Sequence, residues 1–333
     1  MTYFVTGGTS SIGKVLVKEL SARGEEVRLL ARKTSNLSGI LLPGVRVVYG
    51  DVTDKESIEL GIKGCNRVCH LAAVVGANVP EEQWWNINRN GAQNVLEAAV
   101  KTDAESVVMV SSLSVLLPTK AGETADESRD VDTSKYLNLY QKTKRAADDL
   151  ARQFLHEKDL SVKIVYPGYG YGCSFAASHP GMTDQILLRL ASGQPAAIMG
   201  SGKNKIAVAY YKDTANGILL AHENGIAGDD YILGNGNFTL PQIWKTAAKI
   251  LGKEPPKRHL PIPMLKAINM SQKILKGQTP FPQEFFDMIG REWCFSNEKA
   301  KRILHFEPRS FEETMEETWK EYLQQKNQAG EQK

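Results

Sequence analysis

Residues 5–13 read VTGGTSSIG, with a short apolar run before them and a segment of helical period after them. Glycines placed between a strand and a helix indicate a tight turn, which brings backbone N–H groups and the positive end of the helix to one point. Such a point can hold a pyrophosphate. Because this turn lies in the first strand–helix unit of the chain, its context separates it from a chance glycine cluster. The stretch predicts a dinucleotide-binding fold.

Val- and Ile-rich runs alternate with longer segments of helical period beyond this turn. We predict strands in 3–7, 26–32, 45–51, 67–73, 106–112 and 161–168, and helices in 11–23, 83–102 and 134–157. Near-continuous apolar strands separated by helices indicate an α/β fold with a doubly wound parallel Rossmann sheet, whose ligand crevice lies at the carboxyl ends of the strands.

The pattern loosens after Pro167, where Gly and Pro become frequent. One more helix and strand of the main sheet are expected in 209–234. We predict a smaller, mostly helical substrate-binding lobe for the rest. The predicted boundaries are 1–167 and 205–235 for the nucleotide-binding domain, 168–204 and 236–325 for the lobe, and 326–333 for a polar tail.

Bulk properties exclude several classes of protein. The 333 residues carry a formal net charge of +3 with Lys and Arg spread along the chain, so no nucleic acid partner is expected. Cys65 and Cys69 precede His70, but no second ligand pair accompanies them, and we expect no metal site. The start of the chain has no signal-peptide pattern, and no apolar run could span a bilayer. We therefore expect a cytoplasmic protein with reduced cysteines and no membrane partner.

The glycine turn resembles the TGxxGxxG loop of extended and atypical short-chain dehydrogenases/reductases, within the NAD-dependent epimerase/dehydratase superfamily. The chain resembles hopanoid-cluster and dihydroflavonol-reductase-like proteins more closely than the sugar-modifying members. The resemblance implies that the loop binds the cofactor through Thr6, Gly7, Thr9, Ser10, Ser11, Ile12 and Gly13. Ser10 stands where the family has its middle glycine, at the closest approach of backbone and phosphate. It must fit there as a small side chain and could add a hydroxyl contact.

The end of the second predicted strand indicates which nicotinamide cofactor binds. An acidic residue there would favour NAD by accepting hydrogen bonds from a ribose hydroxyl, but this chain has Arg32 and Lys33. A guanidinium suits a 2′-phosphate, and similar dihydroflavonol-reductase-like proteins have an arginine here, so NADP(H) is expected. The resemblance further implies cofactor contacts from Asp51, Val52, Ala72, Ala73, Tyr140, Lys144, Pro167 and Gly168.

Tyr140 and Lys144 are the strongest candidates for chemistry. Four residues apart on a helix, they share one face, and a nearby ammonium would lower the phenol's pKa towards neutrality. Tyr136 has no lysine four residues later. Ser111 and Ser112 end the preceding strand, where a hydroxyl could hold a substrate carbonyl.

The order of serine, tyrosine and lysine resembles the short-chain dehydrogenase triad, which assigns catalysis to Ser112, Tyr140 and Lys144. Leu116, Leu117 and Pro118 replace the family's usual tyrosine–glycine and alter one pocket wall. Asn88 matches an asparagine that is structural in extended members of the family, so we assign it no chemistry. The resemblance implies that Asp213 caps a helix.

These residues predict an NADP(H)-dependent oxidoreductase that moves hydride between nicotinamide and a ketone or aldehyde, or a secondary alcohol. Two alternatives remain open: a nucleotide-sugar epimerase or dehydratase with tightly held NAD, and a non-catalytic NADP-sensing binding protein. The expected partner is a small carbonyl or alcohol substrate, and a homodimer is left open. Candidates for the wall of a bulky, apolar or aromatic substrate's pocket are Trp84, Trp85, Tyr169, Tyr171, Phe175, His179, Phe281, Phe285 and Phe286.

Overall fold

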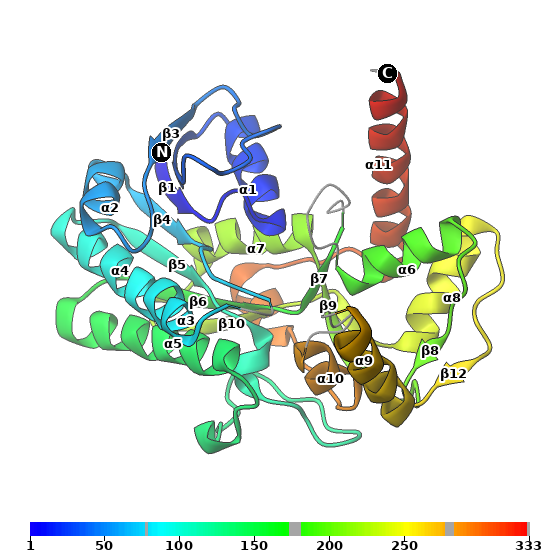
Figure 1. Ribbon diagram of the computed structural model, residues 1–333. Coiled ribbons are helices and arrows are strands. Elements are labelled where there is room, and N and C mark those ends of the chain that lie inside the picture. Colours follow the sequence, from blue (N-terminus) through cyan, green and yellow to red (C-terminus); the bar gives the residue numbers. More distant parts are fainter. Residues whose placement is uncertain (77–78, 173–180, 277–282, 332–333) are drawn as a thin grey trace.

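A seven-stranded parallel sheet forms the centre of the molecule (Figure 1). The computed structural model describes residues 1–76, 79–172, 181–276 and 283–331. The strand order is β10-β6-β5-β4-β1-β2-β3, with every neighbouring pair parallel. The strands are β1 Thr2–Thr6, β2 Glu26–Ala31, β3 Val45–Tyr49, β4 Arg67–His70, β5 Ser106–Val110, β6 Val162–Pro167 and β10 Asp230–Leu233. The predicted doubly wound sheet is confirmed, and its order reverses between β1 and β4, where such sheets bind ligands.

Helices cover both faces of this sheet and bury two separate apolar cores. One face carries α2 Lys55–Ile62, α4 Gly91–Lys101 and α5 Leu139–Lys158, while the other carries α1 Ser11–Ala22 and α7 Tyr211–Asn224 (Figure 1). Short helical segments join these elements: α3 Glu81–Trp84, the π-helix Trp85–Asn90, and the 3₁₀ turns Leu113–Leu116 and Thr133–Lys135. Burial of β5 and β6 on both faces explains why their sequences are continuously apolar.

Side-chain caps determine where several helices begin. Ser10 accepts a hydrogen bond from the Gly13 amide at the start of α1, and Asn138 accepts one from Gln141 at the start of α5. The periodic segment 134–157 predicted the second helix, which starts five residues later because Asn138 caps it there. The caps place both helix N-termini at the same edge of the sheet, next to the strand ends.

The smaller lobe combines helices with two small sheets. Its helices are α6 Met182–Ala191, α8 Leu240–Leu251, α9 Ile262–Lys276, α10 Gln283–Ile289 and α11 Phe311–Glu331. The π-helix Ala300–Leu304 packs on α7 and β10 of the large sheet domain, although the predicted boundary assigns it to the lobe. Its strands are β7 Tyr169–Tyr171, β8 Ile198–Met199, β9 Lys205–Tyr210, β11 Gly236–Thr239 and β12 His259–Leu260. Since β9 pairs with β7 and β11, residues 205–210 lie outside the large sheet, although the predicted boundary assigns them to the nucleotide-binding domain.

The end of the chain also differs from the prediction. Residues 326–331 do not form a frayed tail, because α11 continues to Glu331. The polar composition suggested fraying, but Gln, Lys, Ala and Glu are good helix formers that extend an anchored helix readily. Residues 332–333 lie outside the described residues. Within the described part of the chain, no helix is both long and apolar enough to cross a membrane.

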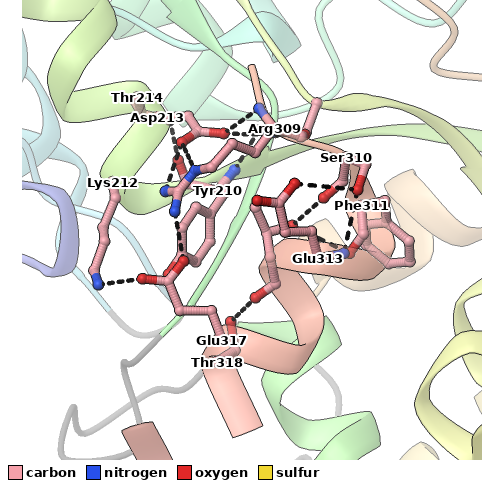
Figure 2. Close-up of polar contacts among 12 residues, drawn as sticks. Tyr210, Lys212, Asp213, Thr214, Arg309, Ser310, Phe311, Glu313, Glu317 and Thr318 are labelled. Atoms are coloured by element: carbon pink, nitrogen blue, oxygen red, sulfur yellow. Dashed lines mark hydrogen bonds and ion pairs between the residues drawn. The ribbon is translucent and has the colours of Figure 1, made fainter. Parts of the chain in front are cut away.

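Asp213 and Arg309 connect the large sheet domain to α11 (Figure 2). Asp213 Oδ1 accepts hydrogen bonds from Nε and a terminal nitrogen of Arg309 at 2.9 and 2.7 Å, and Oδ2 accepts from the Arg309 amide at 2.9 Å. The same guanidinium donates to Glu317 of α11 at 2.5 Å and lies over the Tyr210 ring at 4.9 Å. The cap prediction for Asp213 is wrong, because Tyr210 is the N-cap and Asp213 lies inside the first turn.

Asp213→Ala tests the strength of this connection. The carboxylate is buried but Arg309 is one-third exposed, so we expect a loss of about 2–3 kcal/mol in the free energy of unfolding, at the lower end for breaking a buried pair. Urea unfolding measures it. Lys249→Ala is the control: it removes an exposed ion pair between α8 and Glu312 of α11, and less than about 1 kcal/mol should be lost. Equal losses in the two variants would contradict this assignment.

Candidate active site

The ends of β1 and β4 meet at the glycine turn. Gly7 has φ +71°, and a Cβ atom added to it would lie 2.6 Å from the Ala72 nitrogen, so only glycine fits. Below this contact, the Thr6 hydroxyl lies 2.8 Å from His70 Nδ1 and accepts from the Ala72 amide at 3.3 Å. These bonds place half-buried Ala72 and Ala73 next to the turn. They also show that the fully buried Thr6 side chain orders the strand ends from inside.

The first turn of α1 fits a pyrophosphate. Within the described residues, the amides of Ser11 and Ile12 have no carbonyl partner, as expected for the first two positions of a helix. The Ser10 hydroxyl is used as a cap on the Gly13 amide at 3.1 Å, a role that the sequence argument missed. The S-x-x-G spacing between residues 10 and 13 is the signal that could have found it. Ser10 therefore replaces the family's glycine without removing the helix-end donors.

Two cations lie where the adenosine end of a dinucleotide would reach. Arg32 and Lys33 directly follow β2 and are exposed, and neither forms an ion pair with any described residue. At the end of β3, Asp51 accepts hydrogen bonds from Thr53, and the Val52 carbonyl accepts one from Asn94 at 2.9 Å. The predicted cofactor residues of β1, β2, β3 and β4 thus follow neighbouring strand ends of one sheet.

Ser112, Tyr140 and Lys144 converge at the end of β5. Tyr140 is the second residue of α5, and Ser112 lies close enough to its phenol to lower the pKa of that group. The Ser112 hydroxyl also lies 2.9 Å from the Ser114 hydroxyl and accepts from the Ser114 amide. Lys144 is buried one turn later and donates to the carbonyl of Val110, the last residue of β5, at 2.7 Å. Ser111 points elsewhere, because its hydroxyl donates to Asp148 at 2.8 Å. The two serines after β5 therefore have different partners, and Ser112 is the one beside Tyr140.

The pKa of Tyr140 shifts in the opposite direction to the one expected. Burial raises the pKa of this phenol, and the hydrogen bond with Ser112 opposes that rise only in part. The i, i+4 spacing predicts that the Lys144 ammonium acts on the phenol, but the ammonium is directed to the Val110 carbonyl. Tyr140 is therefore a protonated phenol at neutral pH, the state that can give a proton to a carbonyl oxygen.

Asp148 is a buried acid that the sequence argument did not single out. It lies one turn beyond Lys144 on the same face of α5 and is 1% exposed. Burial raises its pKa to about 7, while the Lys144 ammonium and the Ser111 hydrogen bond lower it. In turn, burial lowers the pKa of Lys144 and the Asp148 carboxylate raises it. The i, i+4 spacing from Lys144 is the signal that could have indicated this charge partner.

Asn88 connects the β4 loop to the catalytic helix. Its side chain accepts from the Val74 amide at 2.7 Å and donates to the Thr143 hydroxyl at 3.0 Å. It is fully buried in the π-helix that precedes α4. Asn88 therefore holds two parts of the site together, in agreement with the structural role implied for it.

The predicted pocket aromatics separate into different environments. Trp84 packs edge-to-face against Tyr140 with ring centroids 6.1 Å apart, next to the candidate chemistry. Tyr171 is a core residue packed on Tyr210 and Phe311, while Tyr169 is half-buried and packs edge-to-face on Trp293. Half-buried Trp85, Phe285 and Phe286 remain candidates, the last two packed on each other. Phe175, His179 and Phe281 lie outside the described residues.

Pro167 is the last residue of β6, and Gly168 follows it directly. The Gly168 amide donates to the Leu233 carbonyl at 3.1 Å, and an added Cβ would lie 2.7 Å from the Ala207 carbonyl oxygen. The turn is therefore tied to both β10 and β9. It places the predicted nicotinamide-facing residues at the same sheet edge, where the lobe begins.

This arrangement defines a class of protein: a Rossmann-fold oxidoreductase of the extended short-chain dehydrogenase type. The family model described as the NAD dependent epimerase/dehydratase family matches residues 3–234, and the chain belongs to that family. Its members bind a nicotinamide cofactor, so the predicted resemblance is confirmed.

Relatives and a solved structure support the same class. A protein provisionally named a dihydroflavonol 4-reductase, from Synechocystis sp., is 30% identical over 91% of this chain and 89% of its own length. The 4-hydroxy-2-methyl-3-oxo-4-farnesyl-3,4-dihydroquinoline-1-oxide ketoreductase of Stigmatella aurantiaca is 24% identical over 92% of each chain. The crystal structure of gox2253 superposes with a TM-score of 0.82 at 28% identity, covering 97% of this chain and 98% of that one.

Substitution of Tyr140 tests the choice of proton donor. Tyr140→Phe should lower kcat about 10²-fold or more, the usual cost of removing a general acid, and leave the Kd of the cofactor nearly unchanged. Lys144→Ala should damage both quantities. The assay is reduction of a panel of ketones and aldehydes, followed by NADPH absorbance, with calorimetry for the Kd.

Tyr136→Phe is the matched control on the same segment. The Tyr136 hydroxyl donates to the Val115 carbonyl at 3.0 Å inside the protein, so its loss should change turnover little. If Tyr136→Phe abolished turnover and Tyr140→Phe did not, the assignment of the donor would be wrong.

Proposed function

We propose that this protein is an NADP(H)-dependent carbonyl reductase, or alcohol dehydrogenase in the reverse direction, acting on a bulky apolar or aromatic substrate. The observation that carries the proposal is the grouping of Ser112, Tyr140 and Lys144 at the sheet edge that also holds the glycine turn. Bound NADPH would supply the hydride. The residues around it have to bind and orient the carbonyl and provide the proton.

The proton would come from Tyr140. A substrate carbonyl oxygen placed between the Tyr140 and Ser112 hydroxyls accepts a hydrogen bond from each, which polarises the carbonyl carbon towards hydride attack. The phenol then transfers its proton to the developing alkoxide. Trp84 limits access of water on one side of the phenol because its ring packs against it. Lys144 joins α5 to the end of β5 through its hydrogen bond to the Val110 carbonyl, and so keeps Tyr140 beside Ser112.

Two observations favour NADP(H) over NAD(H). Arg32 and Lys33 are exposed at the end of β2 without ion-pair partners among the described residues, so their charge is available to a 2′-phosphate. No carboxylate follows β2 to accept a ribose hydroxyl. The name of the Stigmatella relative, a ketoreductase for a farnesyl-bearing quinoline, supports a bulky apolar ketone.

NADP(H) should bind at least about tenfold more tightly than NAD(H), a difference of about 1.4 kcal/mol. Arg32→Ala should erase most of that preference in calorimetry and in ketone reduction with each cofactor. Arg46→Ala is the matched control, because it removes the same charge from the neighbouring strand β3. Arg46 pairs in register with Arg28 near the amino ends of the strands, whereas Arg32 follows the carboxyl end of β2.

Two results would count against this function. Equal dissociation constants for NADP(H) and NAD(H) in the parent protein would remove the cofactor assignment. Near-stoichiometric NAD in freshly purified protein, with sustained conversion of a nucleotide sugar and no added cofactor, would support the epimerase alternative. We expect little bound nucleotide instead, since a reductase must exchange its cofactor in every turnover.

A further inference from the structure

Helix α9, in the smaller lobe (Figure 1), carries several exposed apolar side chains. Met264, Met270, Ile274 and Leu275 are all more than half exposed, the last two at 76% and 77%. At 3.6 residues per turn, these four side chains fall within an arc of about 140°. The other large exposed apolar residues in the described part of the chain are scattered over several elements.

The first turn of the helix anchors it to the lobe. Leu265 is fully buried on the side away from the arc, and Ile262 packs on the core and against Gly290. From Lys266 to Leu275 every residue is exposed or half-exposed. This design differs from a core helix, whose apolar face is covered along its whole length.

Positive charge borders the apolar arc. Lys266 and Lys273 are exposed and lie next to it on one side, and the sequence of α9 contains no Asp or Glu. An apolar face flanked by lysines suits the surface of an anionic bilayer, where the apolar side chains enter the acyl boundary and the ammonium groups meet phosphates. A second copy of the chain fits less well, because a two-fold contact would bring the lysines of both helices together without an acid to pair them.

A chain of contacts connects α9 to the candidate active site. Ile262 lies against Gly290, and Trp293 donates to the Met288 carbonyl of α10 at 3.2 Å. The Trp293 ring packs on Tyr169, which directly follows the Pro167–Gly168 turn. The start of α9 is therefore connected, through these contacts, to the Pro167–Gly168 turn at the edge of the candidate active site.

We propose that α9 docks the protein on an anionic lipid surface, with Met264, Met270, Ile274 and Leu275 in the bilayer interface. The sequence predicts no membrane partner because it has no apolar run long enough to span a bilayer. A helix that lies in the bilayer surface needs no such run and is recognised by its exposed apolar face. Docking there gives access to a substrate dissolved in the membrane. That last point rests on the proposed function, while the docking itself does not.

Vesicle flotation with the full-length protein tests the proposal. Vesicles of equal phosphatidylglycerol and phosphatidylcholine should bind the parent protein at least about tenfold better than pure phosphatidylcholine, and 0.5 M salt should weaken that binding. The double variant Ile274→Ser/Leu275→Ser should bind the anionic vesicles more than about tenfold more weakly. Lys266→Ala and Lys273→Ala should each weaken binding roughly fivefold.

Leu60→Ser is the matched control, because Leu60 on α2 is 75% exposed and lies on the other domain. It should bind like the parent. Absence of binding by the parent, or equal binding by the parent and the double variant, would overturn the proposal. So would a dimer in sedimentation that the double variant converts to monomer, since the face would then be an interface between copies.

Reduction of a water-soluble ketone separates this proposal from the proposed function. The double variant should reduce it as fast as the parent, since none of its changed residues belongs to the catalytic edge. Vesicle binding without any ketone reduction would leave the docking proposal standing and remove the reductase. Reduction without vesicle binding would do the reverse.

Discussion

The close approach of Gly7 to Ala72 is the constraint on which the site depends. The backbone at the end of β1 passes so near the end of β4 that a single methyl group on Gly7 would lie 2.6 Å from a backbone nitrogen. This contact occurs at the point where the strand order reverses, so the chain leaves β1 towards one face of the sheet and β4 towards the other. The amides of Ser11 and Ile12, which have no carbonyl partner among the described residues, begin α1 a few residues after this contact. The hydroxyl of Thr6 and the ring of His70 hold the contact in place from below.

The site also depends on a buried pair of opposite charges, Lys144 and Asp148, close to Tyr140. Lys144 and Asp148 are both almost completely buried on one face of α5, and each favours the charged form of the other. Each also has a hydrogen-bond partner at the end of β5, the carbonyl of Val110 for the ammonium and the hydroxyl of Ser111 for the carboxylate. Two adjacent strand-end serines thereby take different tasks. Ser111 donates to Asp148 of the charge pair, whereas Ser112 caps the 3₁₀ turn Leu113–Leu116 and lies beside Tyr140.

Most of the large sheet could be predicted, because its strands are buried on both faces and read as continuous apolar runs, as in SVVMV of β5. The glycine turn and the Tyr140–Lys144 pair could be predicted from local spacing in the sequence. The pairing of β9 with β7 and β11 could not, because it joins short segments far apart in the chain. The direction of the Tyr140 pKa also depends on where the Lys144 ammonium points, which spacing along a helix does not determine. The prediction that Asp213 caps a helix was wrong because its partner, Arg309, is 96 residues away in the sequence.

If the protein is a carbonyl reductase, hydride passes directly from the cofactor to a carbonyl carbon, and an isotope label can follow that transfer. NADPH carrying deuterium at both C4 positions of the nicotinamide is incubated with the protein and a reducible ketone, and the product is analysed by mass spectrometry and NMR. One deuterium on the carbinol carbon and one oxidised cofactor are expected for each product molecule. Deuterium that stays in the cofactor for every ketone and aldehyde, together with epimerisation of a nucleotide sugar without net cofactor consumption, would contradict that expectation.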